Sequence, residues 1–235
     1  MRIRLPFRRT LPEGLRPSYA QCGEDVIVDH LLRNLLGVEQ PTYLDLGAHA
    51  PRRLSNTYLF YRRGCRGTLV EPDPTLAQGI ARDRTEDEVL NIGVTDEGDR
   101  PHEADFFIMA PATLNTFCRD EAEQYANTGS ARIVETRKVE VWPMPHLIQH
   151  VGEPPALLSV DVEGIDHRLL AAADLDTWRP TTICVETLRD AYRGGKESKD
   201  RELIALVRRH GYVRYSDTYI NTIFVAEESW AKRSW

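Results

Sequence analysis

The segment TYLDLGAH, residues 42–49, decides the fold: a short apolar run ends in an acid, a glycine and a histidine. This pattern predicts a buried β-strand that leads into a tight turn, where Gly47 lets the backbone approach a ligand closely. Before it, residues 24–36 carry apolar side chains on one helical face, and Gly37 follows as a C-terminal stop. The sequence therefore predicts a helix followed by a strand at this point.

The segments that follow alternate between the same two patterns. Strands are expected at 67–73, 88–94, 104–110, 131–142, 156–164, 181–187, 213–219 and 221–227, and helices at 55–64, 74–84, 165–175 and 198–211. The acidic segment 120–130 is expected to be an exposed excursion. This alternation predicts an α/β fold with parallel strands joined by right-handed crossovers. The last two strands are close enough in sequence to form an antiparallel hairpin.

The composition limits the class of protein. The chain has 235 residues, 41% of them hydrophobic, so it can bury a core in one large α/β domain or two small ones. Its net charge of −6 argues against nucleic acid as a partner. No apolar run approaches the ~20 residues that span a bilayer. The four cysteines lack metal-ligand spacing, which argues against structural zinc and favours reduced thiols in a cytoplasmic protein.

The N-terminal residues 1–17 are rich in arginine and lack periodicity, which predicts a basic tail that is not a secretory signal. A flexible or surface-bound arm is the simpler interpretation, and binding to an anionic partner is the alternative. The remaining residues, 18–235, are predicted to form a single domain, in which the segment 95–155 is the least regular.

Four of the predicted strands end in an acidic residue. These residues are Asp45, Glu71, Asp161 and Glu186. In an open parallel sheet, ligands bind at the carboxyl ends of the strands, where the strand order reverses. The four acids are therefore predicted to gather at one ligand site. The alternative is that each is only a polar strand end.

The turn after the first strand lacks the three glycines of a dinucleotide fingerprint, since Pro51 stands at the third position. A pyrophosphate cofactor is therefore disfavoured. Glu71 lies 24 residues after Gly47, near the ~20-residue spacing at which a carboxylate accepts hydrogen bonds from ribose hydroxyls. S-adenosylmethionine, a nucleoside cofactor without phosphates, fits both features. Its adenine contacts are predicted from the next strand end: Asn91, Ile92 and Gly93.

Three short motifs make the sequence resemble one family. QCGED (21–25), SNT (55–57) and DVEG (161–164) occur in the order found in the FkbM-type methyltransferases, and the resemblance covers about residues 19–227. It implies a Rossmann-like class I methyltransferase fold, with a mostly parallel seven-stranded sheet and helices on both faces. It also implies S-adenosylmethionine as methyl donor and a small-molecule acceptor, frequently a sugar or natural-product hydroxyl. The variable segment 95–155 is where acceptor choice is expected.

The resemblance also implies roles for individual residues. Asp45 and Gly47 would lie beside the methionine part of the cofactor, and Glu71 would bind the ribose. Gln21 and the SNT motif would close the pocket. His49 stands where the family usually has asparagine. The complete predicted cofactor-binding set is Gln21, Asp45, Gly47, Ala48, His49, Ser55, Asn56, Glu71, Pro72, Asn91, Ile92, Gly93 and Asp161.

Methyl transfer to a hydroxyl needs a group that removes the hydroxyl proton, and a carboxylate, a histidine or a metal can assist. The predicted catalytic residues are Asp161, Glu163, Glu186 and His49. In one version Asp161 or Glu163 takes the proton and Glu186 hydrogen-bonds the acceptor. In the other, Mg²⁺ bound by Asp161, Glu186 and Asn221 lowers the pKa of the hydroxyl, because Mg²⁺ prefers a few carboxylate oxygens.

Three other functions stay open. They are methylation of a nitrogen acceptor, a non-catalytic S-adenosylmethionine-binding module, and a dinucleotide oxidoreductase on the same sheet. The missing glycines count against the oxidoreductase, and the intact acid-bearing strand ends count against the non-catalytic module. The sequence also leaves open which acceptor is methylated and whether the chain forms a homo-oligomer.

Overall fold

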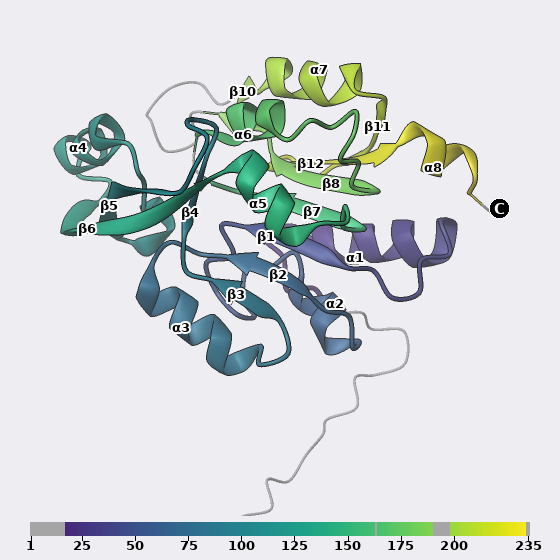
Figure 1. Cartoon of the computed structure of the whole chain (residues 1–235), viewed down its shortest axis with the longest axis horizontal. Coiled ribbons are helices and arrows are strands. Elements are labelled where there is room, and N and C mark those ends of the chain that lie inside the picture. Colours follow the sequence, from purple (N-terminus) through teal and green to yellow (C-terminus); the bar gives the residue numbers. More distant parts are fainter. Residues whose placement is uncertain (1–16, 163, 190–197, 234–235) are drawn as a thin grey trace, which may run out of the picture.

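The computed structural model describes residues 17–162, 164–189 and 198–233, and its centre is a seven-stranded sheet (Figure 1). In spatial order the strands are β11 (Tyr212–Asp217), β12 (Asn221–Ala226), β8 (Thr182–Glu186), β7 (Leu157–Val160), β1 (Tyr43–Leu46), β2 (Gly67–Val70) and β3 (Glu88–Leu90). The five strands from β8 to β3 run parallel, and β12 pairs antiparallel with both β8 and β11. The α/β prediction and the C-terminal hairpin are confirmed. The predicted tail lies outside the described residues, apart from residue 17.

The strand order reverses between β1 and β7. From β1 the chain moves outward through β2 to β3, and it later returns to β7 on the other side of β1. Leu46 pairs in register with Val70 on one side and with Val160 on the other, so three strands end level with one another. A switch point of this kind leaves a crevice at the carboxyl ends of the strands.

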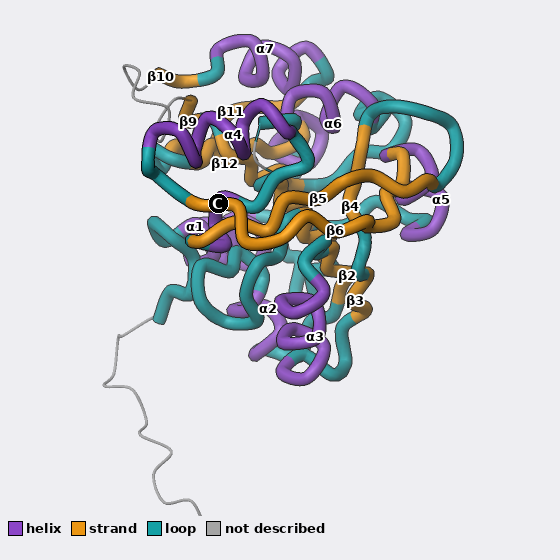
Figure 2. Tube along the Cα trace, turned by 90° about the vertical axis from the view of Figure 1, so that its left-hand side faces the viewer, coloured by secondary structure: helices purple, strands orange, loops and turns teal. Residues whose placement is uncertain are grey.

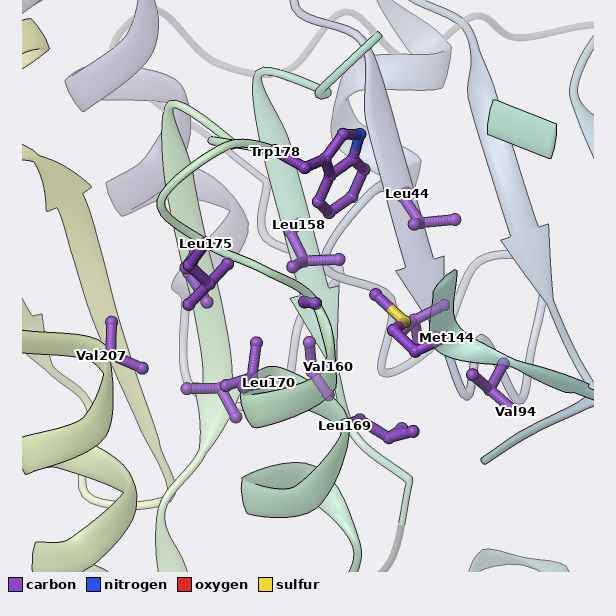
Figure 3. Close-up of a cluster of buried hydrophobic side chains, with 14 of the residues drawn as sticks. Leu44, Val94, Met144, Leu158, Val160, Leu169, Leu170, Leu175, Trp178 and Val207 are labelled. Carbon is purple, nitrogen blue, oxygen red and sulfur yellow. The ribbon is translucent and has the colours of Figure 1, made fainter. Parts of the chain in front are cut away.

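Helices cover both faces of the sheet. One face carries α5 (Met144–Val151), α6 (Asp166–Ala172) and α7 (Arg201–Arg209). Figure 3 shows Leu44, Leu158 and Val160 of this face packed with Met144 and Leu170. Each fully buried side chain of this size contributes roughly 1.5–3 kcal/mol. The other face carries α1 (Glu24–Asp29), the turn η1 (His30–Leu35), α2 (Tyr58–Arg62) and α3 (Pro74–Asp83).

The helix ends follow signals in the sequence. Asp73 caps α3 by accepting hydrogen bonds from the N–H groups of Thr75 and Leu76, and Asp200 caps α7 by the same kind of bond. Such caps satisfy N–H groups that have no partner inside the helix. The helix predicted over 24–36 is present, although its second half, η1, is π-helical.

The single strand predicted over 88–94 is wrong, because this segment forms two strands in different sheets. β3 ends at Leu90, and β4 (Gly93–Thr95) starts a second sheet. Asn91 lies at the break, and its Nδ2 donates hydrogen bonds to the carbonyl oxygens of Glu71 and Pro72, at 2.8 and 3.0 Å. These bonds tie the break to the end of β2, so the chain leaves the main sheet there.

The second sheet has the order β4-β6-β5, and β5 and β6 confirm two predicted strands. Their bounds are His102–Ala110 for β5 and Arg132–Pro143 for β6. In Figure 1 these strands lie to the left of the main sheet, and Figure 2 shows them crossing the face turned toward the viewer, with α4 above and α3 below. The less regular segment of the sequence therefore builds an added layer beside the switch point.

The segment 120–130 is mostly exposed, as predicted, but it is mainly a helix, α4 (Arg119–Thr128), which the sequence does not predict. Its Ala122 and Tyr125 are buried against Phe107 and Met109 of β5. These two buried residues stand among acidic residues, so the sequence shows no clear apolar helical face there. Other unpredicted elements are α5, the 3-10 turn η2 (Ala112–Leu114), the short pair β9 (Leu188–Arg189) and β10 (Ser198–Lys199), and α8 (Glu227–Ala231).

Within the described ranges, no helix combines the length and the apolar character that crossing a membrane requires. The cysteines Cys22, Cys65, Cys118 and Cys184 are free thiols, which agrees with the expectation of unpaired cysteines.

Candidate active site

A cavity of about 230 Å³ lies at the carboxyl ends of the central strands, between the switch point and the second sheet. It is lined by residues from the ends of β2, β7 and β8, from the turn after β1, and from β4, β5 and the segment after β5. Nine predicted site residues line it together: Gln21, Gly47, His49, Glu71, Pro72, Ile92, Gly93, Asp161 and Glu186. The structure thus gathers three of the four strand-end acids at one site.

Gly47 brings the turn after β1 against the end of β7. Its φ is +80°, in the left-handed region, and a Cβ added there would lie 1.9 Å from the carbonyl oxygen of Asp161. The N–H groups of Gly47 and Ala48 both donate to the carbonyl oxygen of Val70, at 3.0 and 3.1 Å. The glycine is therefore required by contact between two backbone segments, in addition to lining the cavity.

Glu71 directly follows β2 and is a buried carboxylate with fixed orientation. One of its oxygens accepts the N–H of His49 and the other accepts the N–H of Asp73, each at 2.8 Å. Burial raises the pKa of Glu71 to about 7, although both hydrogen bonds favour the ionised form. Each carboxylate oxygen can accept further hydrogen bonds, and Glu71 lines the cavity. This arrangement suits recognition of a ligand that carries hydroxyl groups.

His49 positions Glu71 through its backbone. Its φ is +51°, a left-handed conformation that histidine and asparagine adopt more readily than most residues, and its N–H points to the Glu71 carboxylate. Burial, together with the charge of Arg53, lowers the pKa of the imidazole, so the neutral form prevails at pH 7. His49 therefore presents a neutral ring at the cavity wall.

Asp161 directly follows β7 and Glu186 is the last residue of the neighbouring strand β8, and both line the cavity. Their carboxyl groups are hydrogen-bonded to each other. Burial and then the charge of Asp166 raise the pKa of Asp161 well above its usual range. A hydrogen bond between two carboxyl groups requires a proton on one of them, so the contact favours protonation of one member of the pair.

Asp166 holds the loop that follows Asp161. It is buried at the start of α6, and its Oδ1 accepts the N–H of Val162 at 3.1 Å. The predicted catalytic residue Glu163 belongs to this loop and lies outside the described residues. Asp166 thereby fixes the backbone beside the carboxyl pair.

Asp45 and the SNT motif form a buried hydrogen-bond network on the face of the sheet that α2 covers. None of these residues lines the cavity. Thr57 Oγ1 donates to Asp45 at 2.6 Å, and Asn56 Nδ2 donates to Ser159 Oγ at 3.1 Å. Arg84, which is fully buried, donates to Thr57 at 2.9 Å and to Ser55 at 3.4 Å. These bonds join β1, β7 and the segment before α2, and the predicted contacts of these residues with the cofactor stay a prediction.

Two further predicted residues lie beside the cavity without lining it. Ala48 is buried in the core under α1 and α2. Asn91 ties the backbone after Glu71 to the end of β3, as described above. Both support the walls of the cavity from behind.

The predicted metal site, Asp161, Glu186 and Asn221, finds no support in the structure. Asn221 is buried, and its Nδ2 donates to Glu24 at 3.0 Å, while Asp161 and Glu186 are hydrogen-bonded to each other. Among the residues that the structure describes, no group of three or more acids, histidines or cysteines could hold a metal ion. The structure therefore gives no support to the predicted Mg²⁺ site.

The sequence prediction missed most of the apolar lining. The cavity is also lined by Leu54, Val70, Val94, Phe106, Ala112, Thr113, Asn115, Thr116, Phe117, Val162 and Ile165. The residues between 106 and 117 come from the second sheet and the segment after it. Phe106 and Phe117 are the two aromatic residues of this lining. A phenylalanine beside polar residues is equally typical of a strand that packs into a core, so the sequence does not identify either as a cavity residue.

The fold and the site together define a class of protein. The strand order, with an antiparallel strand inserted at the edge and strand-end acids around one cavity, is that of the Rossmann-like methyltransferases. The model of the methyltransferase FkbM domain matches residues 45–214, more than half of the sequence, and the chain belongs to this family. It is therefore an S-adenosylmethionine-dependent methyltransferase. No curated protein sequence matches the chain.

Solved structures of similar fold include other methyltransferases at low identity. A TehB-like SAM-dependent methyltransferase from Corynebacterium glutamicum is 12% identical, with 87% of each chain covered and a TM-score of 0.44. An O-methyltransferase from Bacillus cereus in complex with SAH is 13% identical, with 88% of this chain and 82% of that chain covered and a TM-score of 0.40. The 1,6-didemethyltoxoflavin-N1-methyltransferase of Burkholderia thailandensis is 10% identical, with 87% and 77% covered and a TM-score of 0.43. Such distant likenesses carry no argument about the acceptor.

Proposed function

We propose that the protein transfers a methyl group from S-adenosylmethionine to a hydroxyl of a small-molecule acceptor. One observation carries the proposal: a cavity holds Glu71 at one strand end and the hydrogen-bonded Asp161–Glu186 pair at two others. The first is suited to the ribose of the cofactor, and the second is suited to an acceptor proton. A sugar or natural-product hydroxyl is the acceptor class that the family suggests.

The residues around the cavity fit the parts of the cofactor in order. Glu71 would accept hydrogen bonds from the ribose hydroxyls, because its two oxygens are already oriented by backbone N–H groups. Gly47 and Gln21 would lie along the methionine part, and Ile92 would contact the adenine. This order brings the methyl-bearing sulfur toward Asp161.

When bound, the cofactor supplies an activated methyl group on a sulfonium, so the protein must align the acceptor and remove its proton. A pair that shares one proton keeps one ionised carboxylate, and that carboxylate would accept the proton of the acceptor hydroxyl. A raised pKa makes Asp161 a stronger base than an exposed aspartate. The acceptor oxygen bonds to the methyl carbon, the sulfur–carbon bond breaks, and the hydroxyl proton passes to the carboxyl pair.

Release of S-adenosylhomocysteine measures the reaction directly. The full chain is incubated with S-adenosylmethionine and a panel of hydroxylated compounds, with amines as a second panel. Turnover on a hydroxyl compound is the expected result. Turnover only on amines would support the nitrogen acceptor, and binding without turnover on any compound would support a non-catalytic module.

A matched pair of variants connects turnover to the carboxyl pair. Glu186→Gln keeps the size of the side chain and removes its charge, and Glu153→Gln makes the same change at an exposed position outside the cavity. Turnover is expected to fall in the first variant and to stay at the wild-type level in the second.

A further inference from the structure

Phe117 occupies space that a side chain at position 93 would need. A Cβ added to Gly93 would lie 2.3 Å from Cζ of the Phe117 ring and 2.7 Å from Cε2. Gly93 is the first residue of β4 and directly follows Ile92, which also lines the cavity. The absence of a side chain at this position therefore lets an aromatic ring pack against the strand end.

A second ring supports the first. The centroids of Phe106 and Phe117 are 4.6 Å apart, with a tilt of 47° between the rings. Phe106 is 2% exposed, and both rings line the cavity. Together with Ile92, which lies between β3 and β4, they form an apolar wall, with Phe106 on β5 and Phe117 between η2 and α4.

This wall is tied to Glu71 by a chain of hydrogen bonds. Asn115 Oδ1 accepts the N–H of Met109 at 2.7 Å, and Asn115 Nδ2 donates to Asp73 Oδ2 at 3.2 Å. The N–H of Asp73 in turn donates to Glu71 at 2.8 Å. The segment that carries Phe117 is thus held at a fixed position relative to the carboxylate assigned to the ribose.

We propose that Phe117, supported by Phe106, forms the surface on which the purine of the cofactor lies. The inference rests on the proposed function, since it takes Glu71 as the ribose ligand. The purine is bonded directly to the ribose, so it must occupy the neighbouring part of the cavity, and a flat aromatic ligand stacks well on aromatic side chains. This part of the variable segment therefore serves the cofactor instead of selecting the acceptor.

Calorimetric titration of the full chain with S-adenosylhomocysteine, and separately with adenosine, tests the inference. Phe117→Ala is expected to weaken both ligands by the same factor, about 10-fold or more, because both carry the purine. Phe107→Ala is the control, since Phe107 is the neighbour of Phe106 on β5 and is buried against α4. It is expected to leave both affinities close to those of the wild type.

Two glycine variants test the same contact without truncating the ring. Gly93→Ala places a methyl group against Phe117 and is expected to weaken both ligands. Gly79→Ala, where an added Cβ meets no atom within 4 Å, is expected to leave them unchanged. Circular dichroism and thermal melting confirm folding, and Phe117→Leu replaces Phe117→Ala should the latter fail to fold.

Wild-type affinity for S-adenosylhomocysteine in the Phe117 variant and in Gly93→Ala would overturn the purine assignment and leave the proposed function standing. Loss of S-adenosylhomocysteine binding with unchanged adenosine binding would also overturn it. A wild-type chain that binds neither ligand would instead contradict the proposed function itself, and the purine assignment with it.

Discussion

Asp161 and Glu186 lie at the ends of the neighbouring parallel strands β7 and β8, and their carboxyl groups are hydrogen-bonded to each other at the wall of the cavity. The pairing follows from the topology, because β7 and β8 run side by side in register and place their last residues at one edge of the sheet. Two acids this close cannot both ionise without cost. The pair is therefore suited to exchange a proton near neutral pH.

Asp161→Asn is expected to reduce turnover by about 10²–10⁴-fold, because it removes the group that accepts the acceptor proton. S-adenosylhomocysteine affinity is expected to change little, since Glu71 and the turn at Gly47 remain. In the wild type, activity is expected to fall as the pH drops through neutrality, because protonation of both carboxyls removes the base. S-adenosylhomocysteine release across pH 5–9 checks this, and a pH profile shared by variant and wild type would contradict it.

Turnover is expected to persist in excess EDTA. The reason is that, among the described residues, no group of three or more acids, histidines or cysteines could hold a metal ion, and the carboxyl pair can accept the proton by itself. The assay compares rates before and after chelation and after addition of Mg²⁺, Mn²⁺ or Ca²⁺. Activity that disappears with EDTA and returns with one of these ions would reject the metal-free mechanism.

Glu71→Ala is expected to weaken S-adenosylhomocysteine binding by about 1–3 kcal/mol, because the ribose hydroxyls lose a charged acceptor. The wild-type affinity is expected to decrease as the pH falls through about 7, where burial sets the pKa of Glu71. The sign follows because only the ionised carboxylate offers all its lone pairs to the ribose. Calorimetry from pH 6 to 8 checks both points, and Glu71→Gln should remove most of the pH dependence.

Gly47→Val is expected to abolish S-adenosylhomocysteine binding and also to destabilise the fold. The sequence suggests that a side chain there would meet the ligand, but the structure shows that it first meets the carbonyl oxygen of Asp161. Gly64 is the control that separates the cost of backbone strain from the cost of the steric clash. It also has a positive φ, of +91°, but an added Cβ there meets no atom within 4 Å. Gly64→Ala should lose only the backbone cost of about 1–2 kcal/mol, and Gly47→Ala should lose clearly more in urea denaturation.

Thr57→Val is expected to lower the free energy of unfolding by about 1–3 kcal/mol while changing S-adenosylhomocysteine affinity less than about twofold. The substitution removes the hydroxyl that donates to Asp45 and accepts from Arg84. Thr136→Val, on the exposed part of β6, is the control for stability. A large loss of affinity in a stable Thr57→Val protein would instead support the predicted placement of the SNT motif in the cofactor pocket.

The sequence was sufficient to predict the main sheet and the acids at its edge. Strand polarity and helix punctuation are local signals, and parallel strands necessarily bring their carboxyl ends together. Glu71, Asp161 and Glu186 could therefore be assigned to one site before their contacts were known. The sequence does not predict in the same way where each side chain points, because that depends on which face of the strand the residue occupies.

Asp45 shows where that reasoning stops. It is at the end of a central strand, yet its side chain points to Thr57 and the face covered by α2. The second sheet was also beyond prediction, since the separation of β3 from β4 depends on the hydrogen bonds of Asn91 to the end of β2. Long-range contacts of this kind leave no periodic trace in a single sequence.

Calorimetric titration of the full chain with S-adenosylhomocysteine, with NAD as the competing nucleotide, tests the central claim most directly. The cavity at the switch point is expected to bind one S-adenosylhomocysteine per chain and to show no heat of binding with NAD, because Glu71 can hold a ribose and the turn at Gly47 lacks the glycines that seat a pyrophosphate. Saturable binding of NAD, without binding of S-adenosylhomocysteine, would contradict the assignment of this cavity to the methyl donor.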